Sequence, residues 1–381
     1  MKKVLIANRG EIAVRIIRAC HELGLKTVAV YAKEDEYGVH RFRADEAYQI
    51  GAGKKPIEAY LDMDDIIRVA KQTGADAVHP GYGFLAENEE FAQKCADNGI
   101  IFIGPTVRQL QLFGDKVAAK EVAVKAGLKT IPGTDEPVQS IDEVREFAHT
   151  HGYPIMIKAA MGGGGRGMRI VHDDDELDGA YDRARSEAKQ SFGDDELYVE
   201  KYLKNPKHIE VQILADQHGH VMHLFERDCS VQRRNQKVIE FAPSLALSEE
   251  RRQAICQAAV KLMESVHYQN AGTVEFLVTD EDFYFIEVNP RIQVEHTVTE
   301  LITDVDIVQS QILIADGADL YQDLDLPAQD QLKYNGYGIQ CRVTTEDPEN
   351  NFMPDTGRIE TYRSPGGMGV RLDGGNAYAG A

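Results

Sequence analysis

The sequence predicts three consecutive units: an α/β unit with a doubly wound parallel sheet, an α+β unit, and an incomplete β-rich unit. Three observations predict this order. Strand-like and helix-like runs alternate over residues 3–103, antiparallel strand signals dominate from residue 155, and a β-rich segment follows the polar, proline-bearing stretch 323–331. We expect the boundaries at 1–114, 115–317 and 318–381.

Length and charge are those of a globular protein without a strongly basic surface. The 381 residues, 43% of them hydrophobic, suffice for two or three domains with cores. Lys and Arg number 42 against 62 Asp and Glu, which argues against nucleic acid or an anionic membrane as partner. Five scattered cysteines lack metal-ligand spacing, and no run resembles a signal peptide or membrane span. We therefore expect a cytoplasmic protein.

The first unit alternates strands and helices as βαβ units require. We predict strands at 3–7, 27–31, 77–78 and 100–103, and helices at 10–23, 63–73 and 88–99. Such an order gives a parallel sheet with helices on its faces. The first turn, residues 8–11, holds one glycine and not the G-x-G-x-x-G pattern, so we predict neither NAD nor FAD.

The second unit begins with helices and continues with antiparallel strands. We predict helices at 115–125, 141–150 and 249–266, a further helix ending near 317, and strands at 155–160, 197–202, 208–215 and 220–226. The polar, locally basic residues 228–237 are expected to lie between two strands. Another strand, at 337–343, begins the third unit.

Two apolar runs, 272–279 and 283–289, predict a β-hairpin around residues 280–282. With a three-residue loop, Glu275 faces Glu287, and Asn289 shares their face. Two carboxylates about 5 Å apart repel by roughly 3 kcal/mol, more than a favourable cross-strand pair contributes. These oxygen donors suit Mg²⁺; for an isolated pair, a solvated acidic edge is the alternative.

A glycine-dense loop lies at residues 161–168. Gly162 and Gly167 have the spacing of a P-loop, but Met168 and Arg169 follow, so a Walker A motif is excluded. Strands on both sides would make the loop a lid over phosphates, or a mere flexible turn. Lys158, on the entering strand, suits a phosphate or is a solvated lysine.

Two further segments carry groups that suit an anion. Arg233, Arg234 and Lys237 lie in the basic stretch 228–237, which a solvated turn would explain equally well. Arg291 follows the acidic hairpin, and Glu295 is one short turn away. This carboxylate is a candidate general base, with a simple salt bridge as the alternative.

Many short motifs recur in one known family. They occupy residues 113–116, 156–159, 162–167, 199–203, 208–210, 226–237, 272–276 and 285–296, with 7–13, 79–85 and 339–342 extending them over the whole chain. Together they resemble the ATP-grasp biotin carboxylases. Residues 344–348, 354–358 and 362–373 most resemble pyruvate carboxylases, with the acetyl-CoA carboxylase component as the alternative. The resemblance implies a Rossmann-like N-terminal domain, an ATP-grasp central domain and a partial β-rich C-terminal domain.

The resemblance also implies the ligands: ATP, Mg²⁺ or Mn²⁺, bicarbonate and biotin. The implied ATP-binding residues are Lys116, Lys158, Gly164, Gly165, Glu200, Lys201, Tyr202, Leu203, His208, Gln232, Asn235, Glu275, Leu277 and Glu287. The implied metal ligands are Glu275, Glu287 and Asn289. The implied bicarbonate and biotin residues are Lys237, Arg291, Gln293, Val294, Arg342, Tyr82 and Gly83.

The implied catalytic residues are Lys237, Arg291, Glu295 and Arg342. Glu295 would take the proton of bicarbonate, whose oxyanion attacks the γ-phosphate of ATP to give carboxyphosphate. This would release CO₂ and phosphate, the phosphate would take the biotin N1′ proton, and Arg342 would stabilise the ureido anion. The reaction is the first half-reaction of pyruvate carboxylase, which makes oxaloacetate from pyruvate.

The chain departs from the family pattern in two ways. Asn235 stands where many relatives have His, and the family domain usually continues for several tens of residues beyond Ala381. The chain also lacks a Met-Lys-Met biotinyl site and a carboxyltransferase domain. We therefore expect a fragment of a longer polypeptide that supplies the biotin carboxyl carrier and carboxyltransferase domains, in a homo-oligomer. A carbamoyl-phosphate synthetase-like ligase and an inactive nucleotide-binding module are the alternatives.

Overall fold

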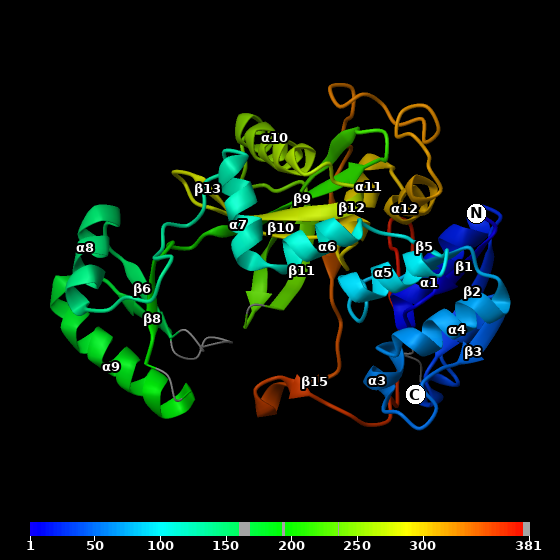
Figure 1. Cartoon of the computed structure of the whole chain (residues 1–381), viewed down its shortest axis with the longest axis horizontal. Helices are drawn as coiled ribbons and strands as arrows, with labels where there is room; N and C mark the ends of the chain where they lie inside the picture. Colours follow the sequence, from blue (N-terminus) through cyan, green and yellow to red (C-terminus); the bar gives the residue numbers. More distant parts are fainter. Residues whose placement is uncertain (160–167, 193–194, 235, 376–381) are drawn as a thin grey trace.

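Three regions follow one another across the molecule in a computed structural model that describes residues 1–159, 168–192, 195–234 and 236–375. An α/β unit lies at one end, a large sheet with helices in the centre, and a smaller lobe at the other end (Figure 1). The predicted combination of α/β and α+β units is confirmed. The predictions for Gly164, Gly165 and Asn235 lie outside the described residues.

The N-terminal unit is a parallel sheet in the order β3-β2-β1-β4-β5. Its strands are β1 (Lys3–Ile6), β2 (Lys26–Tyr31), β3 (Glu46–Gln49), β4 (Ala77–His79) and β5 (Ile101–Phe102), and its helices are α1 (Gly10–Glu22), α2 (Val39–Arg43), α3 (Pro56–Tyr60), α4 (Met63–Thr73) and α5 (Glu89–Asp97). Val4 and Ile6 pack with α1, whereas Leu5 packs with α4 and α5 on the opposite face. The predictions missed only β3 among these strands, since its polar residues show no alternation.

The central sheet is antiparallel, in the order β13-β12-β9-β10-β11-β14. Its strands are β9 (Lys207–Ala215), β10 (Val221–Arg233), β11 (Gln236–Ala242), β12 (Asn270–Val278), β13 (Phe283–Asn289) and β14 (Gly338–Cys341). The helices beside it are α6 (Val107–Gly114), α7 (Lys116–Lys125), α10 (Glu249–Ser265), α11 (His296–Thr303) and α12 (Ile307–Ala315). Ile209, Val211 and Ile213 of β9 pack into the core that α10 covers. The polar residues between them therefore point to the other face.

The prediction for residues 228–237 was wrong. This stretch was expected between two strands, but β10 continues to Arg233 and β11 begins at Gln236, so both sides of the stretch are strand. Asp228 and Cys229 are buried, whereas the described residues 230–234, 236 and 237 are partly or fully exposed, so no apolar alternation marks these strand ends. The basic residues therefore stand on a hairpin and not on a loop.

The pairing of Glu275 with Glu287 is confirmed, although the loop prediction was wrong. Val278 pairs with Phe283, so the hairpin loop comprises the four residues 279–282. A bulge beside Phe276 then shifts the register by one residue and brings the two glutamates opposite each other. The face was predicted correctly because the bulge offset the error in loop length.

The smaller lobe carries a sheet in the order β7-β6-β8, covered by two helices. Its elements are α8 (Ile141–His151), β6 (Ile155–Ala159), β7 (Met168–Val171), α9 (Asp174–Phe192) and β8 (Leu197–Lys201). The C-terminal part of the described chain contains β15 (Glu346–Asp347), the 3₁₀ helix η2 (Pro348–Asn350) and β16 (Met353–Pro354). In the described ranges, no helix combines the length and apolar character needed to cross a membrane.

Candidate active site

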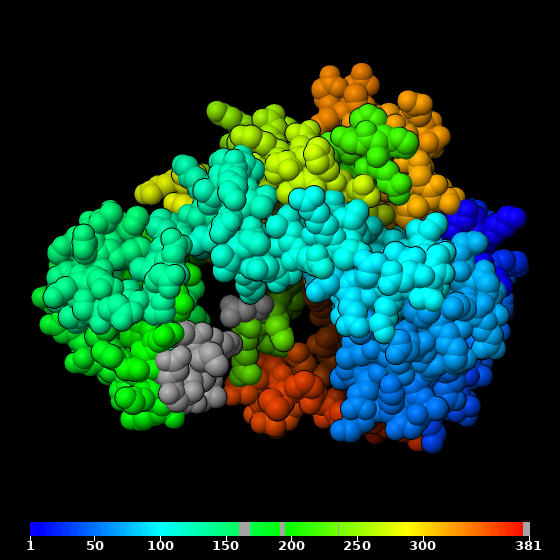
Figure 2. All heavy atoms as spheres, viewed as in Figure 1, coloured from blue at the N-terminus to red at the C-terminus, as the bar shows by residue number. Residues whose placement is uncertain are grey.

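A cluster of charged side chains occupies the polar face of the central sheet, opposite the face packed on α10. His208, Glu210 and Gln212 alternate on β9 with the apolar residues of the core. Lys237 on β11 and Glu275 on β12 reach the same cluster. Figure 2 shows the molecule hollowed between the smaller lobe and the N-terminal unit, with the β10–β11 hairpin visible in the hollow. The cluster thus stands where three parts of the chain meet.

Lys237 lies among three buried carboxylates. Its Nζ donates to Glu275 Oε1 at 2.9 Å and to Glu295 Oε1 at 3.0 Å, and it also makes an ion pair with Glu210. Burial acts to lower the pKa of Lys237, but the three carboxylates outweigh it and raise that pKa above its usual value. The ammonium is therefore the charge that balances this group of acids.

Glu275 accepts hydrogen bonds on both carboxylate oxygens. Oε1 accepts from Lys237, from Asn289 Nδ2 at 2.7 Å and from Gln293 Nε2 at 2.9 Å, while Oε2 lies 2.7 Å from His208 Nε2. Burial favours the neutral acid, yet His208 and Lys237 lower the pKa of Glu275 to about 2. Glu275 is thus held as an anion by the residues predicted to surround the nucleotide and bicarbonate.

Glu287 lines a cavity of about 220 Å³ together with Lys116, Glu87 and Asn289. Burial and then Glu275 raise the pKa of Glu287, against a smaller opposing effect of Lys116. The donor set fits a hard divalent cation, because two carboxylates face each other and one of them is costly to ionise without added positive charge. The amide oxygen of Asn289, a predicted metal ligand, instead accepts a hydrogen bond from Arg291 Nη2 at 2.9 Å in this structure.

Arg291 connects this cavity with the N-terminal unit. Its Nη1 donates to the Ile292 carbonyl at 3.2 Å, and its Nε lies 3.4 Å from Glu87 Oε1. Glu87, which the sequence did not single out, comes from the segment between β4 and α5. The ion pair brings a residue of the first unit to the edge of the predicted bicarbonate site.

Glu295 is bound by a different cation on each oxygen. Oε1 accepts from Lys237, and Oε2 accepts from Arg342 Nη2 at 2.8 Å. Arg342 Nε donates to Glu240 Oε1 at 2.6 Å. Burial raises the pKa of Glu240 and Arg342 opposes that rise. Because β14 pairs with β11, Arg342 arrives beside Glu295 and Glu240 from the C-terminal part of the chain.

A fully buried arginine, Arg227 on β10, forms hydrogen bonds to residues of the cluster, and the sequence analysis did not single it out. Its Nη2 donates to Gln293 Oε1 at 2.8 Å and lies 3.4 Å from Glu210 Oε2, while its Nη1 donates to Gln212 Oε1 at 2.7 Å. Gln293 is thereby held between Arg227 and Glu275. The alternation of charged and apolar residues on β9 and β10 was the available signal for these supporting groups.

The residues predicted for the nucleotide are split between two regions. In the smaller lobe Lys158 and Glu200 form an ion pair, and Lys201 Nζ donates to the carbonyls of Gly152 and Tyr153 at 2.8 and 3.1 Å. Among the described residues, no hydrogen bond or ion pair joins these side chains to Lys237. The remaining predicted residues Tyr202, Leu203, Gln232, Leu277 and Val294 are partly exposed.

Tyr82 and Gly83 follow β4, beside the point where the strand order reverses between β1 and β4. Ligands of doubly wound sheets bind at this type of position. Asn8 Nδ2 donates to the carbonyls of Pro80 at 2.7 Å and Tyr82 at 2.8 Å, and the Tyr82 hydroxyl donates to Glu11. The loop predicted to border biotin is therefore fixed to the start of α1.

Replacing Glu11 by glutamine is expected to increase stability at alkaline pH. Burial and then Asp373 raise the pKa of Glu11 to about 7 from 4.5. The folded protein thus keeps a proton that the unfolded chain releases, so stability falls as pH rises through this window. The shift corresponds to up to roughly 3 kcal/mol. In urea unfolding at several pH values, the free energy of unfolding should fall less with rising pH for Glu11→Gln than for the wild type. Glu22→Gln, an exposed change on the same helix, is the control; equal pH dependence in all three proteins would contradict the expectation.

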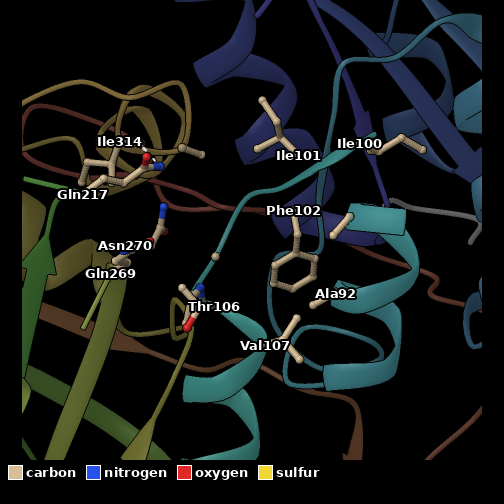
Figure 3. A pocket seen from close by; sticks show the side chains of 14 residues that line it. Ala92, Ile100, Ile101, Phe102, Thr106, Val107, Gln217, Gln269, Asn270 and Ile314 are labelled. Carbon is tan, nitrogen blue, oxygen red and sulfur yellow. Dashed lines mark hydrogen bonds between the residues drawn. The ribbon is translucent and has the colours of Figure 1, made fainter. Parts of the chain in front are cut away.

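A second cavity, of about 240 Å³, lies between the N-terminal unit and the central region. Figure 3 shows Phe102, Thr106 and Asn270 around it, together with Ile101 and Ile314. None of the predicted site residues lines this cavity. It is therefore separate from the charged cluster.

Comparisons with known proteins identify the family to which the chain belongs. Residues 1–110 match the family "Biotin carboxylase, N-terminal domain", residues 115–323 match "Carbamoyl-phosphate synthase L chain, ATP binding domain", and residues 340–381 match "Biotin carboxylase C-terminal domain". The chain belongs to the biotin carboxylases, which are ATP-dependent ligases with an ATP-grasp domain. The resemblance found in the sequence and the predicted fold class are thus confirmed.

Pyruvate carboxylases are among its most similar relatives. The chain is 62% identical to "Pyruvate carboxylase" of Bacillus subtilis and 56% identical to "Pyruvate carboxylase, mitochondrial" of Homo sapiens, in both cases over all of its own length. It spans 33% and 32% of those two proteins, about one third of the relatives it matches.

Solved structures of single domains give the same result. The crystal structure of the biotin carboxylase subunit of pyruvate carboxylase is 50% identical, with a TM-score of 0.87, all of this chain matched and 83% of that chain covered. The biotin carboxylase domain of thermophilic 2-oxoglutarate carboxylase bound to bicarbonate is 48% identical, with a TM-score of 0.92, all of this chain matched and 82% of that chain covered.

Proposed function

We propose that this chain catalyses the ATP- and bicarbonate-dependent carboxylation of biotin as the first half-reaction of a pyruvate carboxylase. The observation that carries the proposal is the placement of Glu295 between Lys237 and Arg342, beside the paired glutamates of the β12–β13 hairpin. The site combines a carboxylate base, two cations for an oxyanion and an oxygen-rich metal position. These are the groups that activation of bicarbonate by ATP requires.

Lys237, Arg291 and Gln293, with the Val294 backbone, would bind bicarbonate. Lys237 and Gln293 already converge on Glu275 Oε1, at 2.9 Å in both cases, so their donors point into one small volume. Glu295, one hydrogen bond from Lys237, takes the bicarbonate proton, and the oxyanion then attacks the γ-phosphate of ATP. The positive groups stabilise the charge that develops on the transferring phosphoryl group.

The nucleotide and its metal would occupy the region of Glu287. Lys116 shares the cavity with Glu287 and suits a phosphate, while Lys158 and Glu200–Leu203 in the smaller lobe would approach the phosphates and adenine, with His208 near the ribose. Gln232 and Leu277 would complete the ATP site. Glu275, Glu287 and Asn289 would hold Mg²⁺ or Mn²⁺. When bound, such an ion neutralises phosphate charge.

Arg342 and the loop with Tyr82 and Gly83 would receive biotin. Arg342 is held by Glu240 and Glu295 at 2.6 and 2.8 Å, so its guanidinium is fixed before biotin arrives. Its charge can stabilise the ureido anion once the biotin N1′ proton has left. Fixed donors of this kind avoid reorganisation during the reaction.

The partners follow from the full-length relatives. We propose that a biotin carboxyl carrier domain and a carboxyltransferase domain act with this chain, which spans about one third of the pyruvate carboxylases it matches. A solved relative from Hydrogenobacter thermophilus is described as a biotin carboxylase domain dimer, which supports a homo-oligomer. We also propose a cytoplasmic location, no nucleic-acid partner, and domain boundaries at 1–114, 115–317 and 318–381. A biotin carboxylase component of acetyl-CoA carboxylase is the second candidate.

Hydrolysis of ATP by the full chain tests the proposal. With Mg²⁺ present, we expect phosphate release that requires bicarbonate and increases when free biotin is added. Glu295→Gln should reduce the bicarbonate-dependent rate by roughly 10²–10⁴-fold, the usual contribution of a positioned general base. Glu349→Gln, which makes the same substitution at an exposed glutamate outside the charged cluster, should leave the rate unchanged. Hydrolysis without any dependence on bicarbonate would contradict the proposed function.

A further inference from the structure

The tip of the β10–β11 hairpin is connected to the C-terminal segment through one arginine. Arg233, the last residue of β10, forms an ion pair with Glu346, and its guanidinium carbon lies 4.3 Å from the ring centroid of Phe352. Glu346 and Phe352 flank η2 in the short hairpin of β15 and β16. Figure 1 shows this segment below the free ends of β10 and β11. Two different interactions thus converge on a single side chain.

The hairpin tip needs such support because its neighbouring strands end before it. The pairing of β10 with β9 ends at Asp228, and the pairing of β11 with β14 ends at Ile239. The described residues 231–234, 236 and 237 therefore lie beyond the residues that pair with either neighbouring strand. In the described part of this tip, two side chains form ion pairs with other parts of the molecule. Lys237 binds the carboxylates of the charged cluster, and Arg233 binds Glu346 of the C-terminal segment.

Arg233 and Lys237 stand on adjacent rungs of the hairpin. Arg233 pairs with Gln236, and Gln232 pairs with Lys237. A change in the position of Arg233 therefore moves the strand pair that carries Lys237. The ion pair is about one third exposed on the arginine and one fifth exposed on Glu346, so solvent screens it only partly. The aromatic face of Phe352 adds a second attraction for the same cation.

We propose that Arg233 is a positioning residue for the bicarbonate site. Its joint contact with Glu346 and Phe352 fixes the hairpin tip, and the fixed tip holds Lys237 in register with its three carboxylates. This inference rests on the proposed function of Lys237. It also assigns a role to the C-terminal segment 346–352, which holds the hairpin tip through Glu346 and Phe352.

Charge reversal in the full chain tests the connection. The variants are Arg233→Glu, Glu346→Arg and the double exchange, with Phe352→Leu as a milder change. Hydrogen–deuterium exchange of the backbone amides at 231–242 is measured without substrate. We expect each single reversal to speed exchange there by about tenfold, and the double exchange to restore protection, since the ion pair is re-formed in the opposite sense. Phe352→Leu should give a smaller effect of the same kind.

Bicarbonate kinetics supply the second readout. We expect the single reversals to raise the KM for bicarbonate about tenfold with a smaller change in kcat, because they displace a binding group and leave Glu295 in place. Glu349→Arg makes the same charge change as Glu346→Arg, at an exposed residue of the adjacent 3₁₀ helix η2, and should alter neither measurement. Unchanged exchange at 231–242 in Arg233→Glu, or a double exchange no better than the single variants, would overturn the proposal. Hydrogen–deuterium exchange does not depend on turnover. If only the proposed function is wrong, the proteins will therefore lack bicarbonate-dependent activity, but the single reversals will still speed exchange and the double exchange will still restore protection.

Discussion

Replacing Lys237 by methionine is expected to destabilise the fold by about 3–5 kcal/mol and to reduce bicarbonate-dependent ATP hydrolysis by at least about a hundredfold. The ammonium contacts Glu210, Glu275 and Glu295, all of which are buried. Its removal leaves three carboxylates close together with less compensating charge. Such a loss costs far more than deletion of an exposed ion pair.

The measurement combines urea unfolding with the phosphate-release assay. Lys207→Met is the matched control, since Lys207 is an exposed lysine on strand β9 of the same sheet. We expect the control to keep both stability and activity. Lys237→Arg keeps the charge and should recover most of the stability, while the larger, planar head group should restore little activity. A Lys237→Met protein as stable as the control would show that other groups balance the acids.

The sequence predicted the faces of the strands better than their ends. Period-two alternation placed Glu275 and Glu287 opposite each other, and the structure agrees. The assumed loop was one residue too short, and a bulge beside Phe276 offset the error. A bulge has no reliable local signal here, because the residues around it are ordinary strand formers. The prediction succeeded because the extra loop residue and the bulge shift the register by one residue in opposite directions, so Glu275 still pairs with Glu287.

The groups that support the site were harder to predict than the groups in it. Arg227 and Glu240 lie within strands, where their charges looked like the solvent side of a half-buried sheet. Both are fully buried, and each forms a hydrogen bond with a residue distant in sequence: Arg227 Nη1 donates to Thr299 of α11, and Glu240 accepts from Arg342. Arg342 reaches Glu295 only because β14 pairs with β11 across about one hundred residues of sequence. Local periodicity holds no information about such pairings.

The family resemblance filled part of this gap and left another part open. It assigned roles to Arg342 and Lys237 before their contacts were known, but it gave no reason for Glu87 to approach Arg291. It also did not indicate the ion pair between Arg233 and Glu346. These contacts depend on how separate units pack together. Short motifs describe the groups that meet a substrate, whereas packing between units determines which groups hold them in place.

The second large effect is expected for Glu287→Gln, which should reduce Mg²⁺-dependent turnover by about 10²–10³-fold without loss of stability. Glu287 faces Glu275 across the hairpin, and it is half-buried beside a cavity that Lys116 also lines. Glutamine keeps the shape of the side chain and removes the repulsion between the two carboxylates. Without divalent cation, the melting temperature should therefore stay equal or rise by about 2 °C.

Glu275→Gln is the informative comparison, because Glu275 is bound by His208, Lys237, Asn289 and Gln293 whereas Glu287 borders the cavity. We expect this variant to lose turnover and also to melt at a lower temperature, since His208 and Lys237 lose a charged partner. Addition of Mg²⁺ with ATP should raise the melting temperature of the wild type more than that of either variant. Wild-type turnover in Glu287→Gln would remove this residue from the metal ligands. Equal melting temperatures for the two variants would mean instead that the contacts of Glu275 contribute little to stability. A lower melting temperature for Glu275→Gln alone would show that Glu275 maintains the fold, whereas Glu287 acts through the cation.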